Sequence, residues 1–251
     1  MPRLLVVEND PDSGLRRLHP WFEAEGLTVE VRPGLHGLPA NLDGYAGLVL
    51  LGGGLMPDDD AAAPWLARER VLAREAIDAD LPTLGICLGA QLLALVDAGD
   101  VRANHGSPER GSTALTCTPA AREDGLFGAV PESFHAIENH RDVIVALPPG
   151  ATLLASSAAC RNQAFRLGSR VWGVQFHPEV DAARLTRWDS AALAAGGFDS
   201  DALAATAAAN EPDTQRACRE LARAFAAQVR GQPTKSTYAG SLSDSTRSTL
   251  R

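Results

Sequence analysis

The sequence predicts an α/β fold: a three-layer α/β/α sandwich with a central, mostly parallel β-sheet, followed by C-terminal helices. Short apolar segments of strand length alternate along the chain with longer segments whose apolar residues recur at helical spacing. This alternation is typical of parallel sheets covered by helices on both faces. A hydrophobic fraction of 45% in 251 residues is also enough to bury a sizeable core.

Four strands are expected in the first half of the chain, over residues 3–8, 27–32, 45–51 and 82–86. The first has Leu-Leu-Val-Val at its centre and is expected to be a buried parallel strand. Asn9-Asp-Pro-Asp-Ser13 is a turn and a helix start, from which a helix is expected to run to about Glu25. A second helix, with acidic and basic residues interspersed, is expected over roughly 62–79, and a third after Cys87.

In the second half of the chain the alternation of strands and helices gives way to a series of short strands. Short strands separated by turns are expected over residues 113–118, 134–138, 152–157, 162–167 and 171–176. They look like antiparallel additions and the last strands of the sheet. Alanine-rich helices are expected next, and the Ser-, Thr- and Gly-rich end is expected to be disordered. These shifts predict a main domain over 1–180, a helical extension over 181–230 and a disordered tail over 231–251.

The composition argues against several kinds of partner and site. With 23 basic and 31 acidic residues the net charge is −8, which disfavours nucleic acid or an anionic membrane as the main partner. The four cysteines are far apart and form no CxxC pair, so neither a metal site nor a disulfide framework is indicated. No signal peptide or apolar run of membrane length is present. These features predict a protein of the reducing cytoplasm.

The stretch Pro-Thr-Leu-Gly-Ile-Cys-Leu-Gly-Ala-Gln, residues 82–91, changes from strand to helix at a cysteine. Gly85 and Gly89 flank Cys87 in the pattern of a nucleophile elbow, whose sharp turn exposes the side chain at the carboxyl end of the sheet. Cys87 would also begin the following helix, and the positive end of that helix favours the nucleophilic thiolate. Taken alone, the pattern also fits a buried structural cysteine.

A second polar group ends a strand near residue 180. His177 and Glu179 follow the apolar segment Val-Trp-Gly-Val-Gln-Phe. Residues two apart in extended chain project to the same side, so Glu179 can reach the imidazole of His177 and fix its orientation. His177 would then act as general base and acid for a cysteine nucleophile. Without the elbow, the pair would indicate no more than a polar strand end.

A run of three glycines, Gly52-Gly53-Gly54, follows the strand that ends at Leu51. A flexible turn or a phosphate-binding loop is the alternative interpretation, but no Lys-Ser/Thr follows, so the run is not a P-loop. Its free backbone N–H groups can point at a ligand. One of them and the N–H of Leu88 are expected to form an oxyanion hole.

Together these motifs resemble the class I glutamine amidotransferase family, in which a Gly-x-Cys-x-Gly-x-Gln elbow pairs with a strand that ends in His-Pro-Glu. The resemblance covers about residues 3–180, with the three motifs in the family's order. It implies a flavodoxin-like sandwich and a catalytic triad of Cys87, His177 and Glu179.

The same resemblance implies further site residues. Gly53 or Gly54 and Leu88 would donate to the oxyanion, and Gln91, the last residue of the elbow motif, would contact bound glutamine. No metal or organic cofactor is needed for this chemistry.

Finer features resemble one branch of the family, the glutaminase domain of GMP synthase and its free-standing relatives. Asn-His-Arg-Asp before Leu-Pro-Pro-Gly implies substrate-binding roles for His140 and Asp142, with a surface turn as the alternative interpretation. The chain departs from the family at Asn139 and Ser112, where relatives often carry aromatic residues. These smaller residues are expected to widen the leaving-group side of the site.

Three functions follow from the resemblance. The first is a glutaminase that supplies ammonia to a separate synthetase, because the segment after Asp181 has no P-loop or Ser-Gly-Gly-x-Asp motif. The second is a stand-alone γ-glutamyl hydrolase that acts on a γ-glutamyl peptide or a protected metabolite. The third is a non-catalytic module with an amidotransferase fold, and the complete triad argues against it.

Overall fold

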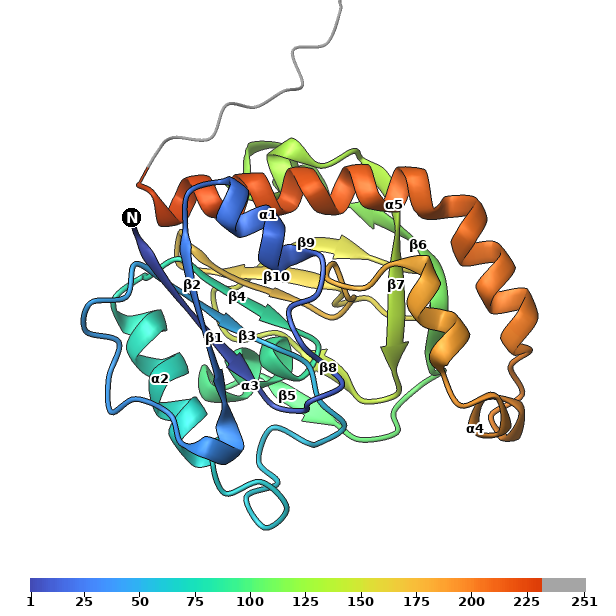
Figure 1. Ribbon diagram of the computed structural model, residues 1–251, viewed down its shortest axis with the longest axis horizontal. Helices are drawn as coiled ribbons and strands as arrows, with labels where there is room; N and C mark the ends of the chain where they lie inside the picture. The colour runs from blue at the N-terminus through green and yellow to red at the C-terminus, as the bar shows by residue number, and fades with distance from the viewer. Residues whose placement is uncertain (232–251) are drawn as a thin grey trace, which may run out of the picture.

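The protein is built on a nine-stranded mixed sheet, and a computed structural model describes residues 1–231 (Figure 1). The strand order is β2-β1-β3-β4-β11-β10-β9-β6-β7. The strands are β1 (Arg3–Glu8), β2 (Thr28–Pro33), β3 (Gly47–Leu50), β4 (Thr83–Ile86), β6 (Glu109–Cys117), β7 (Ser133–His140), β9 (Thr152–Ser156), β10 (Ala164–Leu167) and β11 (Val171–Val174). From β2 to β11 neighbouring strands pair in parallel, and β10, β9, β6 and β7 continue the sheet in antiparallel fashion. The predicted parallel centre with antiparallel additions is confirmed.

Helices cover both faces of the parallel strands. They are α1 (Leu18–Ala24), α2 (Leu66–Asp78), α3 (Leu88–Val96), α4 (Ser190–Ala195) and α5 (Ser200–Val229). In β1, Leu4 and Val6 join one buried cluster with α1 and α5, whereas Leu5 and Val7 join another with α2 and α3. Because successive side chains of a strand point to opposite faces, this alternation makes three layers. Figure 1 shows α5 and α1 on one side of the sheet and α2 and α3 on the other.

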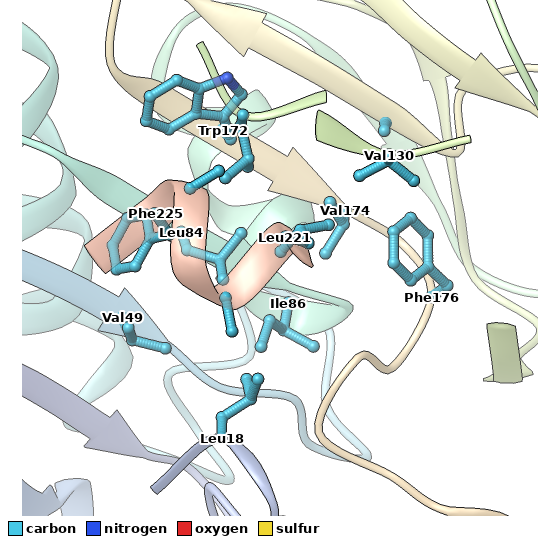
Figure 2. Packing of buried hydrophobic residues seen from close by; sticks show 14 of the residues in the cluster. Leu18, Val49, Leu84, Ile86, Val130, Trp172, Val174, Phe176, Leu221 and Phe225 are labelled. Atoms are coloured by element: carbon cyan, nitrogen blue, oxygen red, sulfur yellow. The ribbon is translucent and has the colours of Figure 1, made fainter. Parts of the chain in front are cut away.

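The C-terminal helix α5 is part of the main core. Figure 2 shows Phe225 and Leu221 facing Leu84 and Trp172 of the sheet. Trp172 and Phe225 are fully buried, with ring centroids 6.4 Å apart at 83°. Full burial of each such aromatic side chain stabilises the fold by about 1.5–3 kcal/mol. Residues near 225 therefore hold the same sheet that carries the predicted active site.

The sequence analysis did not anticipate a small second sheet. It pairs β5 (Asp100–Arg102) with β8 (Val143–Ala146). The two strands are three and four residues long, and β5 is largely polar, so neither carries a local signal strong enough to identify it. The first helix also begins later than expected, at Leu18, because a turn in which Ser13 N donates to Asp10 O (2.8 Å) comes first.

The segment after Asp181 is helical, as expected. It forms a 3-10 turn over Ala182–Arg187, then α4 and the long α5. The expected disordered tail, apart from Gly231, lies outside the described residues. Within residues 1–231, every helix is too short or too polar to cross a membrane.

Candidate active site

Cys87 occupies a sharp turn between β4 and α3. Its backbone φ of 52° lies in the left-handed region, which residues other than glycine rarely adopt. A Cβ on Gly89 would lie 2.1 Å from the Leu50 carbonyl oxygen, and one on Gly85 would lie 2.6 Å from the carbonyl oxygen of Gly89. The glycines at both sides are therefore required by packing, which explains the spacing of the elbow motif.

His177 and Glu179 lie beyond the end of β11. The His177 amide donates to the Ile137 carbonyl (2.8 Å), which ties this segment to β7. His177 Nδ1 lies 2.7 Å from Glu179 Oε1, and both residues are buried. Among the described residues, His177 Nε2 has no hydrogen-bond partner. The carboxylate thus holds one ring nitrogen and leaves the other available for proton transfer.

The imidazole of His177 approaches the cysteine over Gly52. A Cβ built on Gly52 would lie 3.2 Å from His177 Cε1 and 3.5 Å from Cys87 Cβ. Burial by itself lowers the pKa of His177, but the charges of Glu179 and Cys87 outweigh it and raise this pKa well above its usual value. The surroundings therefore favour an imidazolium beside the thiol.

Two cavities meet at Cys87. The larger, about 300 Å³, is lined by Cys87 with His177 and Glu179. The smaller, about 200 Å³, is lined by Cys87 with Gln91, His140, Asp142 and others. Gly53 and Gly54 line both cavities. The structure thus brings nearly all the predicted site residues around one sulfur atom.

Leu88 is expected to contribute its backbone N–H to the site and not its side chain. Its side chain is fully buried, and the N–H of this residue belongs to the first turn of α3, where amides have no carbonyl of their own helix to bond. A Cβ on Gly53 would lie 3.1 Å from Leu88 Cδ2, so the glycine loop packs directly against the start of the helix. This closeness fits the expected oxyanion hole.

A hydrogen-bonded network that the sequence analysis missed supports the glycine loop. Asn9 Nδ2 donates to Leu51 O (3.1 Å) and to Glu69 Oε1 (3.1 Å), and Trp65 Nε1 donates to Asn9 Oδ1 (2.9 Å). Burial raises the pKa of Glu69 to about 8. These residues come from three separate segments, so no local pattern could have joined them.

Gln175 was also missed. Its Nε2 lies 3.5 Å from Cys87 Sγ, and its Oε1 accepts from Gln91 Nε2 (3.3 Å). Gln91 Nε2 also donates to the Asp142 carbonyl (3.0 Å). The signal was present in the sequence, because Gln175 stands two residues before His177 and would face the same side if the predicted strand continued to His177. In the structure β11 ends at Val174 and the chain bends at Gln175 and Phe176.

The imidazole of His140 lies in a buried cluster next to the cavity. Its Nε2 is 3.1 Å from Glu109 Oε2 and 3.3 Å from Glu138 Oε2, and its side chain is only 1% exposed. Burial, and next the charge of Glu109, raise the pKa of Glu138 well above its usual value. The carboxyl groups thus contact only Nε2 of the imidazole, and its Nδ1 has no hydrogen-bond partner among the described residues. Asp142 is nearer the surface. Substrate binding by His140 and Asp142 stays a prediction.

The same cluster is a weak candidate for a metal site. Glu109, His140 and Cys160 place one ligand atom each within 4.8 Å of one another. However, the Glu109 carboxylate already accepts hydrogen bonds from Ser157 Oγ (2.7 Å) and Gln163 Nε2 (2.7 Å). Burial also raises the pKa of Cys160 to about 12, which disfavours the thiolate that a metal requires.

The two positions that depart from the family lie in different places. Asn139 lines both cavities. Ser112 lines neither of them, and its hydroxyl accepts from Asn210 Nδ2 (3.1 Å) of α5. The expectation that Ser112 widens the leaving-group side is therefore wrong, because α5 covers this residue.

Known proteins resemble this chain in sequence and structure. Residues 12–194 match the family model of class-I glutamine amidotransferases. One subunit of a glutamine-hydrolysing GMP synthase from Thermoplasma acidophilum is 38% identical over 150 residues, which are 59% of this chain and 70% of that protein. The γ-glutamyl peptidase 5 of Arabidopsis thaliana is 34% identical over 146 residues, 56% of each chain. A crystal structure of a glutamine amidotransferase from Thermotoga maritima superposes with a TM-score of 0.78 at 26% identity, covering 91% of this chain and 97% of that one.

Proposed function

Because the chain belongs to the class I glutamine amidotransferase family, a family of hydrolytic enzymes, we propose that it cleaves the side-chain amide of glutamine through a thioester on Cys87. The observation that carries this proposal is the convergence of Cys87, the His177–Glu179 pair and the glycine loop on two cavities that meet at the sulfur.

In the first step the Cys87 thiolate attacks the γ-carbonyl carbon of glutamine and forms a C–S bond. The carbonyl oxygen gains the negative charge, and the N–H groups of Leu88 and of the glycine loop stabilise it. His177 gives its proton to the leaving nitrogen as the C–N bond breaks, and ammonia departs. A water molecule then loses a proton to His177 and attacks the thioester, which releases glutamate and restores the thiolate.

The two cavities suggest where each half of the substrate lies. His177, the proposed proton donor to the leaving amine, lines the larger cavity and not the smaller one. Gln91, the expected contact of the glutamyl group, lines only the smaller cavity. The glutamyl group is therefore assigned to the smaller cavity, and the amine leaves through the larger one.

The ammonia is proposed to serve a separate synthetase subunit. The similar protein from Thermoplasma acidophilum is named as one subunit of a glutamine-hydrolysing GMP synthase. Between Asp181 and Gly231 the chain forms a 3-10 turn, α4 and α5, and α5 packs on the sheet as part of the main core.

A γ-glutamyl hydrolase is the second candidate function. It is favoured by the similarity to a γ-glutamyl peptidase and by the size of the larger cavity, which at about 300 Å³ exceeds what ammonia needs. Asn139, smaller than the aromatic residue common in the family, lines this cavity. In this function the leaving group would be the amine of an amino acid or peptide.

Steady-state kinetics on the full chain distinguish the two functions. Glutamate release would be measured from glutamine and from γ-glutamyl amides of increasing size, with and without candidate synthetase subunits. Cleavage of glutamine that depends on an added synthetase supports the ammonia-supplying role. Faster cleavage of larger amides by the isolated chain supports the hydrolase. Cys87→Ala serves as the inactive control in both series.

A further inference from the structure

We propose that Arg110 and Arg141 form a clamp for the α-carboxylate of the glutamyl group, so that the site accepts only γ-glutamyl compounds with a free α-carboxylate. This inference rests on the proposed function, because it takes the glutamyl group to lie in the smaller cavity. The resemblance to the family assigns no role to either arginine.

The position of the two side chains is the first argument. Both arginines line the smaller cavity, which begins at Cys87, and both line a further cavity of about 280 Å³ on their other side. They therefore form the wall between the two spaces. A glutamyl group bound with its γ-carbonyl at Cys87 would direct its α-carbon end away from the thiol and toward this wall.

The hydrogen bonding of Arg110 is the second argument. Its Nη1 donates to the carbonyls of Glu109 (3.0 Å) and His140 (2.6 Å), so the half-buried guanidinium is held in place by backbone atoms. A fixed guanidinium with N–H groups to spare suits a planar carboxylate, which it can bind with two parallel hydrogen bonds.

The charge balance is the third argument. Among residues 1–231, no carboxylate lies within ion-pair distance of Arg110 or Arg141. Burial and then the charge of Arg141 lower the pKa of Arg110, while Cys87 and Asp142 raise it. Two cations that repel each other beside a substrate cavity would be stabilised by a bound anion.

The cavity also contains a negative charge, the carboxylate of Asp142, which suits the α-ammonium group of an amino acid. Among residues 1–231, Asp142 is the only acidic residue that lines it, and one of its oxygens accepts from the Asn104 amide (2.8 Å). A free α-ammonium group beside Asp142 and a free α-carboxylate at the arginines would complete the recognition of a zwitterion. A glutamine residue inside a peptide chain has neither group and would be excluded.

The clamp can be tested without catalysis. In the Cys87→Ala protein, isothermal titration calorimetry would compare glutamine with glutamine α-amide, in which a neutral carboxamide replaces the α-carboxylate. Loss of a charge-assisted pair predicts that the α-amide binds about 10- to 100-fold more weakly. Arg141 is exposed and makes no ion pair among residues 1–231, so Arg141→Met is expected to leave the fold intact. Adding this substitution should weaken the binding of glutamine about tenfold and leave the binding of the α-amide nearly unchanged.

Two variants complete the design. Arg110→Met should weaken the binding of glutamine as Arg141→Met does. Arg102 is an exposed residue of β5 that lines none of these cavities, so Arg102→Met should bind glutamine as tightly as the Cys87→Ala parent. Equal affinity of the Cys87→Ala protein for glutamine and its α-amide would overturn the clamp and leave the proposed function intact. Binding of neither compound would overturn the assignment of glutamine and the clamp with it.

Discussion

Glu179 Oε1 lies 2.7 Å from Nδ1 of His177, and this buried pair fixes which imidazole nitrogen can exchange a proton with Cys87. His177 is anchored by the Ile137 carbonyl, and a turn in which the Val180 amide donates to the His177 carbonyl (3.3 Å) brings Glu179 back to the imidazole. The position of the carboxylate thus sets both the orientation and the charge of the base.

This pair predicts unequal losses of activity. His177→Ala should lower kcat for glutamate release by about 10³-fold or more, because the proposed general base and acid is lost. Glu179→Gln should lower kcat by about 10- to 100-fold, because the amide still occupies the position but no longer stabilises the imidazolium. The pKa of His177, measured by NMR on the ¹⁵N-labelled imidazole, should fall in Glu179→Gln. An unchanged pKa would contradict the role given to Glu179.

The elbow predicts a stability defect at Gly89. A Cβ at this position would lie 2.1 Å from the Leu50 carbonyl oxygen, so Gly89→Ala forces the helix away from the sheet. We expect the free energy of unfolding to fall by at least about 2 kcal/mol in urea titrations. Gly54→Ala is the matched control for stability, because nothing lies within 4 Å of its added Cβ. Equal stability of both variants would show that the elbow does not depend on Gly89.

The sequence predicted those parts of the fold and site that local patterns encode. Alternating apolar segments identified the parallel strands, and Cys87, His177 and Glu179 each sit in a short motif whose spacing reflects backbone geometry. The Glu109–His140 contact joins residues 31 apart on neighbouring strands, so it follows from strand register and not from any motif. Ser112 was misplaced for the same reason, because only the tertiary packing of α5 shows what covers it.

The buried carboxyl of Glu69 predicts a pH-dependent stability. Its pKa is about 8 in the folded protein against an ordinary value of 4.5, so the unfolded chain loses the proton first as pH rises. Stability should therefore fall between about pH 4.5 and pH 8. Glu69→Gln lacks this loss, and its free energy of unfolding relative to the parent should increase by roughly 2–4 kcal/mol from pH 4 to pH 8.

The exposed Glu123→Gln is the control for this experiment, because it makes the same substitution at a carboxyl that is not buried. Chemical denaturation of the three proteins at pH 4, 6 and 8 provides the comparison. A difference between Glu69→Gln and the parent that stays constant over this range would contradict the assigned pKa.

The end of α5 predicts where truncation becomes harmful, and we propose that residues after Gly231 are dispensable for folding. Val229 is buried, and Arg230 Nη1 lies 3.1 Å from Glu25 Oε2 on the far end of α1. Ending the chain after Gly231 should change the melting temperature by less than about 2 °C. Ending it after Gln228 removes a buried valine worth about 1.5–3 kcal/mol, and should lower the melting temperature by about 4–10 °C. A large drop for the longer variant would mean that the tail packs on the domain.

The covalent step tests the account most directly. The full chain would be mixed with glutamine or a γ-glutamyl amide, quenched in acid during turnover, digested and analysed by mass spectrometry. We expect one glutamyl group on the peptide that contains Cys87, removable by hydroxylamine as a thioester. The other thiols should stay free, because burial raises the pKa of Cys117 and Cys218 to about 11. Glutamate release that persists in Cys87→Ala, or that proceeds without an adduct on Cys87, would contradict the proposed mechanism.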